Sequence, residues 1–373
     1  MLFNRVFGKC QINFERNMLL MRKFDCLIIG LFLFVLPSFA QTGITDDKIH
    51  VILSGDHAEP ASGEIHTYMK RIAVIPLKGP SGQLNHMAVS DKHKHLYVAN
   101  KINATLDVID VEEGKLLQQI PGQTGCSGID YAPDLDYVLI ANHGTKQCNI
   151  YKYNGKTYEF VKSIEVEGGN KVRYKKSNQQ FYLANKADGK NILSVYDKDF
   201  NHVTDINLPG GHSSYEIAQN SPRIFMNGPG VIYVVDTDNN KTLESLPVTL
   251  SSVNKPIVID EQANRVFAGC RNPPKVVVFN SKTGKEITSA DIANDLDDFS
   301  FDIKRKRIYA SCGEGYISVV QQIDPDNYKL IENVPTRKHA RTGVFSQGMD
   351  LYFLGVQKTD DMENPEIWVY KPL

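Results

Sequence analysis

Tryptophan, metal-type cysteine motifs and nucleophile motifs are scarce in this sequence, and each absence excludes a class of chemistry. Trp368 is the only tryptophan among 373 residues. A pyrroloquinoline quinone dehydrogenase is expected to show repeated tryptophan-docking motifs, so we exclude that cofactor. No Cys-x-x-Cys-His or Cys-x-x-Cys run occurs, which excludes a c-type haem and a zinc knuckle. The lack of a Gly-x-Ser-x-Gly motif argues against a Ser-His-Asp nucleophile.

An excess of charge of one sign is also missing. Lys plus Arg total 42 and Asp plus Glu total 43, for a formal net charge of −1. A global attraction to nucleic acid or to an acidic membrane is therefore not indicated. Any partner must be recognised by a local feature.

The long apolar run of this chain lies near its N-terminus. Residues 21–40, MRKFDCLIIGLFLFVLPSFA, combine a basic start, an apolar run and a Ser-Phe-Ala cleavage site. They predict a signal region over residues 1–40, with the true start at Met21 and cleavage after Ala40. The mature chain is then periplasmic or secreted and has no integral membrane segment. A retained membrane anchor is the alternative.

The rest of the chain is built from a repeat. Short apolar segments recur at steps of 42 or 43 residues: LYVAN at 96, VLIAN at 138, FYLAN at 181, IFMNG at 224, VFAGC at 266, IYASC at 308 and LYFLG at 351. Each is flanked by further short runs of Val, Ile, Tyr and Phe between Gly, Asn and Asp turns, as half-buried strands require. A period of about 40–45 residues with several strands per repeat predicts an all-β, seven-bladed β-propeller with four-stranded blades.

The two ends of the repeat region are complementary. The seventh repeat ends at IWVYKPL, before a fourth strand. RIAVIPLKG, residues 71–79, precedes the first repeat and can supply that strand. We therefore expect the N-terminal strand to complete the C-terminal blade and close the ring, which leaves no exposed sheet edge. The propeller then spans residues 71–373, and residues 41–70 form a flexible leader rather than a metal-binding tail.

The segment HLYVAN...LDVIDVEEGKLLQQIPG resembles the repeat of the YVTN-type seven-bladed β-propeller family, over essentially the whole mature chain. That family is similar in fold to the heavy chain of quinoprotein amine dehydrogenases, to lactonases of the 6-phosphogluconolactonase type and to streptogramin lyases. The resemblance implies the fold rather than the activity, because one propeller hosts many functions. Repeats 4 to 7 depart from the motif, since Asn-Gly, Gly-Cys, Ser-Cys and Leu-Gly replace its final Ala-Asn.

The repeat also predicts which residues meet at the mouth of the central channel. In a propeller the innermost strand of each blade begins there, ten residues before the aligned second strand of this chain. That register holds His86, Gly128, Lys171, Ser214, Pro256, Asp298 and Arg341. With the loops that follow the second strands, it predicts a ligand-binding rim of Lys101, Lys171, Lys186, Arg271, Asp298, Glu314 and Arg341. Cations outnumber acids in this set, which suits an anionic ligand, and ordinary solvated loop charges are the alternative.

Histidines gather near the same mouth and are the candidates for catalysis: His86, His143, His212 and His339. The first three are also candidate ligands for a divalent metal. No catalytic constellation is complete in the sequence, so the catalytic residues and the metal stay open.

Cysteines and aromatic residues complete the set of candidates. Cys126 and Cys148 both approach the top of the second blade and are the candidate disulfide, with free buried thiols as the alternative. Tyr215 and Phe299 lie next to the rim, but their alternation points them into the blades. Single-stranded nucleic acid is therefore disfavoured as a partner.

Two functions follow from these observations. The first is an exported propeller that binds an anionic small molecule or a protein partner at the mouth of its channel. The alternative is a lactonase- or lyase-type enzyme acting on a sugar acid, with a rim histidine as base. An arginine or a divalent metal would then stabilise the developing negative charge.

Overall fold

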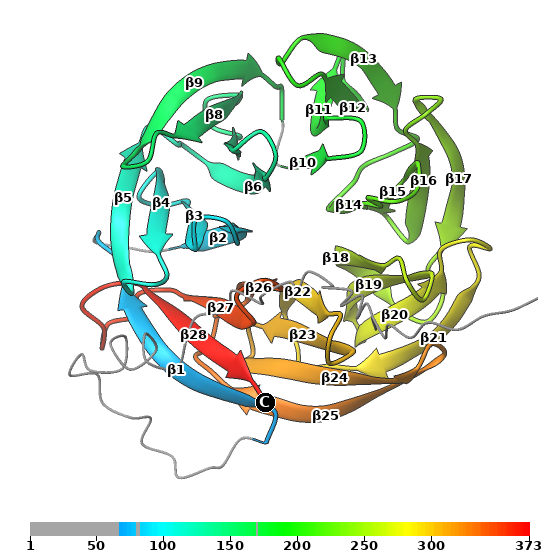
Figure 1. Ribbon diagram of the computed structural model, residues 1–373. Helices are drawn as coiled ribbons and strands as arrows, with labels where there is room; N and C mark the ends of the chain where they lie inside the picture. The colour runs from blue at the N-terminus through cyan, green and yellow to red at the C-terminus, as the bar shows by residue number, and fades with distance from the viewer. Residues whose placement is uncertain (1–66, 80–82, 169–170) are drawn as a thin grey trace, which may run out of the picture. The chain divides into compact units, whose positions relative to one another are not determined.

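The computed structural model describes residues 67–79, 83–168 and 171–373. Within these residues the regular structure consists of 28 β-strands. They form seven four-stranded antiparallel sheets around a central channel (Figure 1). The prediction of an all-β, seven-bladed β-propeller is therefore confirmed. The same described residues contain no helix that is long and apolar enough to cross a membrane, and the predicted signal region lies outside them.

Each blade is a meander whose first strand lines the channel and whose last strand lies at the periphery (Figure 1). The first three blades contain β2 (Leu84–Ser90), β3 (His95–Asn100), β4 (Thr105–Asp110) and β5 (Lys115–Pro121); β6 (Cys126–Ala132), β7 (Tyr137–Asn142), β8 (Gln147–Tyr153) and β9 (Tyr158–Glu165); and β10 (Val172–Lys175), β11 (Gln180–Ala187), β12 (Lys190–Tyr196) and β13 (His202–Asn207). The next three contain β14 (Tyr215–Ile217), β15 (Arg223–Gly228), β16 (Val231–Asp236) and β17 (Lys241–Pro247); β18 (Ser252–Asp260), β19 (Arg265–Asn272), β20 (Pro274–Asn280) and β21 (Glu286–Asp291); and β22 (Leu296–Asp302), β23 (Arg307–Cys312), β24 (Tyr316–Asp324) and β25 (Asn327–Pro335). The seventh contains β26 (Thr342–Ser346), β27 (Leu351–Val356), β28 (Glu366–Pro372) and β1 (Met69–Pro76).

The seventh blade is completed by the N-terminal strand, as predicted. β1 pairs antiparallel with β28, from Met69 opposite Pro372 to Pro76 opposite Glu366. The strand begins two residues earlier than the sequence suggested, so Met69 and Lys70 belong to the sheet and not to the leader. The leader before residue 67 lies outside the described residues.

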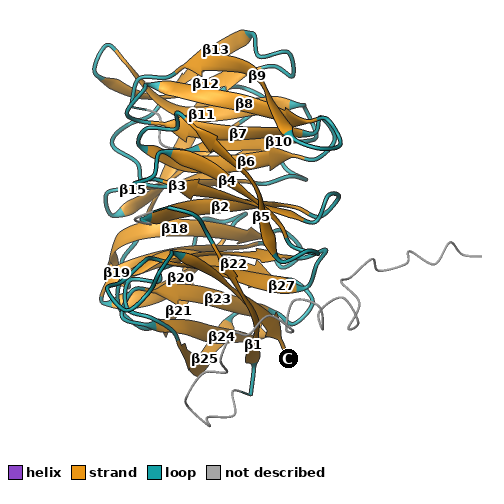
Figure 2. Cartoon of the chain, turned by 90° about the vertical axis from the view of Figure 1, so that its left-hand side faces the viewer, coloured by secondary structure: helices purple, strands orange, loops and turns teal. Residues whose placement is uncertain are grey.

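Burial explains why the second strands read as continuous apolar runs. β3 and β27 are buried along their whole length, because a second strand is covered by a neighbouring blade on each face. The peripheral strand β13 is exposed at four of its six positions and reads HVTDIN. Strands of all blades run between two loop-bearing faces, as the side view shows (Figure 2).

The core consists of seven apolar clusters, each of which lies between two adjacent blades. One large side chain of every second strand fills the same register. Six of the seven are aromatic and at most 1% exposed: Tyr97, Tyr182, Phe225, Phe267, Tyr309 and Tyr352, with Leu139 in the second blade. Burying one such side chain is worth about 1.5–3 kcal/mol. This packing fixes the blades against one another and therefore holds the channel residues in place.

The predicted Cys126–Cys148 disulfide is not formed, and both residues are buried free thiols. Cys126 packs in the cluster between the first and second blades, whereas Cys148 packs in the cluster between the second and third. The two side chains therefore leave blade 2 from opposite faces, with β7 between their strands. Placing both residues near the top of one blade was correct, but it took no account of the face to which each points.

Candidate functional site

The central channel brings together much of the register that the repeat predicted. A cavity of about 410 Å³ opens inside the channel, and its lining includes five of those seven residues: His86, Lys171, Ser214, Pro256 and Asp298. They come from five different blades. A second cavity of about 710 Å³ adjoins it and shares the side chains of Arg173 and Glu216. The channel interior, rather than its outer rim, is the candidate site.

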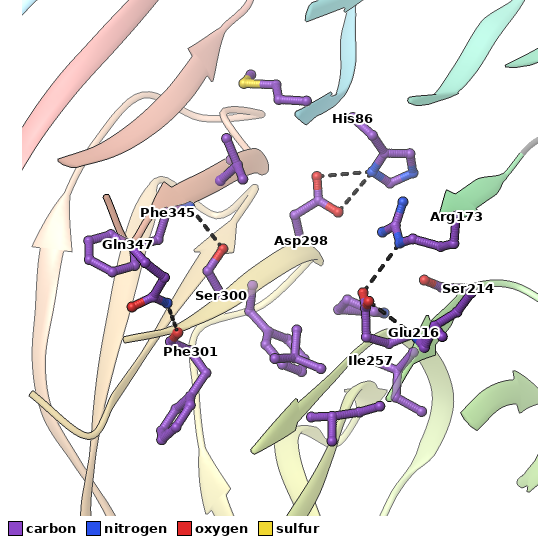
Figure 3. A pocket seen from close by; sticks show the side chains of 18 of the residues that line it. His86, Arg173, Ser214, Glu216, Ile257, Asp298, Ser300, Phe301, Phe345 and Gln347 are labelled. Atoms are coloured by element: carbon purple, nitrogen blue, oxygen red, sulfur yellow. Dashed lines mark hydrogen bonds and ion pairs between the residues drawn. The ribbon is translucent and has the colours of Figure 1, made fainter. Parts of the chain in front are cut away.

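His86 and Asp298 form a hydrogen-bonded pair in this cavity (Figure 3). The Nδ1 atom of His86, on β2, lies 2.8 and 3.0 Å from the two carboxylate oxygens of Asp298, on β22. Burial opposes the charge of Asp298, but His86, followed by Lys171 and Arg173, outweighs burial and lowers the pKa of the carboxyl group. The carboxylate therefore stays ionised and fixes the ring, which is how an acid–base histidine is held.

Arg173 is the second fixed charge. Its Nε donates to Glu216 Oε2 at 3.3 Å, and its Nη1 donates to the backbone carbonyls of Ile129 and Val172 at 3.3 and 3.0 Å. Figure 3 shows the guanidinium between the His86–Asp298 pair and Glu216. Burial disfavours its charge, but Glu216 and then Asp130 outweigh burial and raise the pKa of Arg173.

Asp130 lines the second cavity next to this arginine. Its carboxylate accepts a hydrogen bond from the backbone N–H of Tyr174 at 2.7 Å. Burial raises the pKa of Asp130 to about 6, although Arg173 and this hydrogen bond oppose the shift. As the pH falls, Asp130 therefore loses its charge before Asp298, whose pKa is lowered.

Lys171 differs from its charged neighbours because its amine has no direct partner among the residues that the structure describes. The residue is 5% exposed. Burial, followed by the positive charge of Arg173, lowers the pKa of Lys171 to about 8, and Asp298 and Glu216 offset only part of this shift. Within the part of the chain that the structure describes, the amine donates no hydrogen bond. The same holds there for Arg173 Nη2, and no hydrogen bond engages His86 Nε2, so two donors and one imidazole nitrogen remain available around one cavity.

The outer rim is not the cationic surface that the sequence suggested. Arg271 and Arg341 are both neutralised by Asp295 and Asp297. Arg341 Nη1 donates to the two Asp295 oxygens at 2.9 and 2.8 Å, and Arg271 Nη2 lies 2.9 Å from Asp297 Oδ1. Two longer ion pairs of 3.5 Å join Arg271 to Asp295 and Arg341 to Asp297. The sequence-based charge count left out both aspartates because neither occupies the register used for it. Asp295 lies in the loop before β22, and Asp297 is the second residue of that strand.

The remaining rim residues do not join the cavity. Lys101 and Lys186 are exposed. Glu314 accepts hydrogen bonds from the backbone N–H and the side-chain amide of Asn294, at 2.7 and 3.0 Å, so it holds a loop.

The four candidate histidines separate from one another. His143 and His339 are exposed. His212 is half-buried, and burial together with Lys186 lowers its pKa. Across residues 67–79, 83–168 and 171–373, no group of three or more His, Cys, Asp and Glu side chains is placed to hold a metal ion. The candidate ligands His86, His143 and His212 therefore form no such group among the described residues, and of the four candidate histidines only His86 lines the cavity.

Sequence reasoning missed three charged residues of the cluster, and a signal for them was present. Asp130, Arg173 and Glu216 lie two positions after Gly128, Lys171 and Ser214 of the predicted register. Alternate residues of a strand face the same side, so the residue two further along also faces the channel. Applying that step to every inner strand would have identified them.

Fold and site together define the class, a seven-bladed β-propeller with a charged cluster inside its channel. No protein-family model matches the chain, and no curated protein matches it. Among 1479 matching chains of solved structures is hydrazine synthase from Kuenenia stuttgartiensis. It is 15% identical with a TM-score of 0.64, and the match covers 74% of this chain and 94% of that chain. At this identity the likeness shows the fold alone, and membership of the YVTN-type family stays a prediction.

Proposed function

We propose that the protein binds a small carboxylic acid inside its central channel. The observation that carries this proposal is Lys171, a buried cation that lines the cavity and has no hydrogen-bond partner among the described residues. A buried charge is costly unless it is paired, so the site is incomplete without an anion. Arg173 Nη2 is a further donor on the same cavity, and His86 Nε2 is an imidazole nitrogen without a hydrogen bond among the described residues.

The acids of the cluster restrict the ligand further. Asp298 and Glu216 line the cavity together with Lys171 and Arg173, so the site is not uniformly positive. A ligand with one carboxylate and several hydroxyl groups matches both sets, because the cations receive the carboxylate and the acids accept from the hydroxyls. A hydroxy acid of sugar-acid type fits this pattern better than a polyphosphate.

Titration calorimetry with gluconate, glucuronate, lactate and inorganic phosphate tests the proposal. We expect a carboxylate to bind, and Lys171→Met to raise its Kd by about tenfold to a hundredfold, since charge-assisted hydrogen bonds are worth about 1.5–3 kcal/mol. Lys186→Met is the matched control, because Lys186 is an exposed lysine outside the cavity. Absence of binding by every carboxylate, or equal weakening by both substitutions, would contradict the channel site.

The His86–Asp298 pair supports a second candidate function, acid–base chemistry on a bound sugar acid or its lactone. The carboxylate at Nδ1 orients the ring, and Nε2 then acts as the base. Lactone opening and proton elimination are assayed directly with His86→Gln. That variant should lose activity roughly a hundredfold or more while it still binds the acid product. Unchanged turnover in His86→Gln excludes this candidate.

We further propose that the chain is exported, with the signal region removed after Ala40. The basic start, the apolar run and the cleavage site of residues 21–40 support this. Mass spectrometry of the protein expressed with its native N-terminus should find a chain that begins at Gln41. A chain that retains residues 21–40 would contradict export by cleavage.

A further inference from the structure

Lys171 is anchored at its backbone, whereas its amine has no hydrogen-bond partner within residues 67–79, 83–168 and 171–373. Its carbonyl oxygen accepts hydrogen bonds from the backbone N–H of Ala184 at 3.1 Å and from the hydroxyl of Tyr215 at 3.2 Å. Tyr215 is completely buried, and its single hydroxyl proton is shared between this carbonyl and the carbonyl of Tyr182, which lies closer at 2.6 Å. The root of the side chain is therefore fixed, while the residue lines the cavity and its amine makes no hydrogen bond to any described residue.

We propose that Lys171 is a nucleophile that forms an imine with the carbonyl carbon of a small α-keto acid bound in the channel. This inference rests on the proposed carboxylate site and names a substrate class for it. Arg173 would hold the carboxylate, because it lines the cavity, only its Nε and Nη1 have partners among the described residues, and a guanidinium offers planar recognition of an anion. The carbonyl group next to that carboxylate then faces the neighbouring amine of Lys171.

The electrostatic setting keeps part of the Lys171 amine neutral, which a nucleophile requires. Burial and the charge of Arg173 lower the pKa of Lys171 to about 8. An amine that is desolvated and next to a second cation is a recognised way to activate lysine for imine formation. At pH 7 the neutral fraction exceeds that of an ordinary surface lysine on the order of a hundredfold.

Protons balance within the same cavity. The amine nitrogen attacks the carbonyl carbon, and the carbon–oxygen π bond breaks. Both amine protons leave with the former carbonyl oxygen as water, and a carbon–nitrogen double bond remains. His86, oriented by Asp298, carries these protons from nitrogen to oxygen through Nε2. No oxidant or metal enters the step.

Another buried lysine, Lys175, has an amine with a purely structural role and can be compared with Lys171. Lys175 is 3% exposed, and its amine donates to the backbone carbonyls of Ala218 and Ser221. Both of its hydrogen bonds serve to hold a turn. Lys175 therefore provides an internal control, with burial similar to that of Lys171 but with its amine occupied.

Borohydride trapping tests the inference on the protein of residues 41–373. The protein is incubated at pH 7 with pyruvate or glyoxylate, reduced with sodium borohydride and mapped by peptide mass spectrometry. Hydride adds to the imine carbon and a solvent proton to nitrogen, which leaves a stable secondary amine. We expect one adduct at Lys171, formed on the order of a hundredfold faster than at surface lysines, and none at Lys175. His86→Gln should slow its formation roughly a hundredfold.

The outcomes separate this inference from the proposed function. Adducts spread over surface lysines without preference for Lys171 would overturn the nucleophile. Binding of lactate, which has no ketone, combined with no trapping of pyruvate, would leave the carboxylate site and remove only the imine. Failure of pyruvate and of lactate to bind would remove both. Lys171→Arg, which keeps the charge but cannot form the imine, should bind lactate and show no adduct.

Discussion

Two sets of charges surround the channel, and they are arranged in opposite ways. On the outer rim, Arg271 and Arg341 share Asp295 and Asp297, so that four charges neutralise one another. Inside the channel, Lys171 lacks a partner among the described residues, and Arg173 Nη2 and His86 Nε2 make no hydrogen bond there. The rim charges therefore form ion pairs between neighbouring blades, whereas the channel charges are arranged as in a ligand-binding site.

The difference separates charges that serve the fold from charges that serve a ligand. Arg271 lies on β19 of the fifth blade, and Asp295 and Asp297 lie just before and on β22 in the sixth. Arg341 directly precedes β26 of the seventh blade. These ion pairs therefore join three blades and need nothing further. A buried lysine without a partner costs free energy in the folded protein, and retaining such a residue is a recognised mark of a functional site.

The largest expected effect of a single substitution concerns Lys171. Lys171→Met should increase the free energy of unfolding at pH 7 by about 1–3 kcal/mol, because it removes a desolvated charge and keeps an unbranched side chain of similar length. Urea denaturation followed by fluorescence measures the change. A loss of stability would mean that Lys171 is a structural charge like those of the rim.

The next largest effect is the pH dependence of the stability that Lys171→Met gains over the wild-type protein. The folded-state pKa of Lys171 is about 8, below the ordinary lysine value of 10.5, so the unfolded chain binds more protons between these limits. The penalty on the wild-type protein is full below pH 8 and is relieved as the pH rises towards 10.5. The advantage of Lys171→Met should therefore shrink by up to about 3 kcal/mol between pH 7 and pH 10. A difference that is constant with pH would show that the amine is solvated.

Breaking an ion pair of the rim should have a smaller effect on the free energy of unfolding, and of the opposite sign. Arg341→Met removes the bidentate partner of Asp295 and should lower the free energy of unfolding by about 1–2 kcal/mol, since the pairs are only partly buried. Carboxylate binding in the channel should not change. Lys186→Met serves as the surface control, with a change within about 0.5 kcal/mol. Loss of ligand binding in Arg341→Met would show that rim and channel act as one site.

The smallest effect concerns the cysteines. Cys126, Cys148, Cys270 and Cys312 are buried free thiols, so adding a reductant should leave the melting temperature of residues 41–373 unchanged. Thiol titration of the unfolded, non-reduced protein should recover all four. A lower melting temperature on reduction would indicate a covalent bond that contradicts the packing of Cys126 and Cys148 on opposite faces.

The fold followed from the sequence because each blade repeats one pattern, and the register that it defined placed His86, Lys171, Ser214 and Asp298 correctly at the channel. The site followed only in part. Periodicity predicts where a backbone position lies around the ring, but it does not show which neighbours a long side chain reaches. Arg271 and Arg341 therefore looked like free cations until Asp295 and Asp297 were placed beside them. The predicted Cys126–Cys148 disulfide was wrong for a related reason. The repeat showed how far along the blade each cysteine lies, but not the face of the sheet to which its side chain points.

The pairing of β1 with β28 has a consequence for how the chain can be cut and rejoined. The backbone N–H of Leu373 donates to the Tyr68 carbonyl at 2.9 Å, so the two ends of the described propeller lie side by side. A short linker could join them, and new ends could be opened in an exposed hairpin such as Asp238–Asn239, between β16 and β17. Such a circular permutant keeps every strand pairing and all seven inter-blade clusters. The propeller fold therefore does not depend on which of its hairpins is opened to form the chain ends.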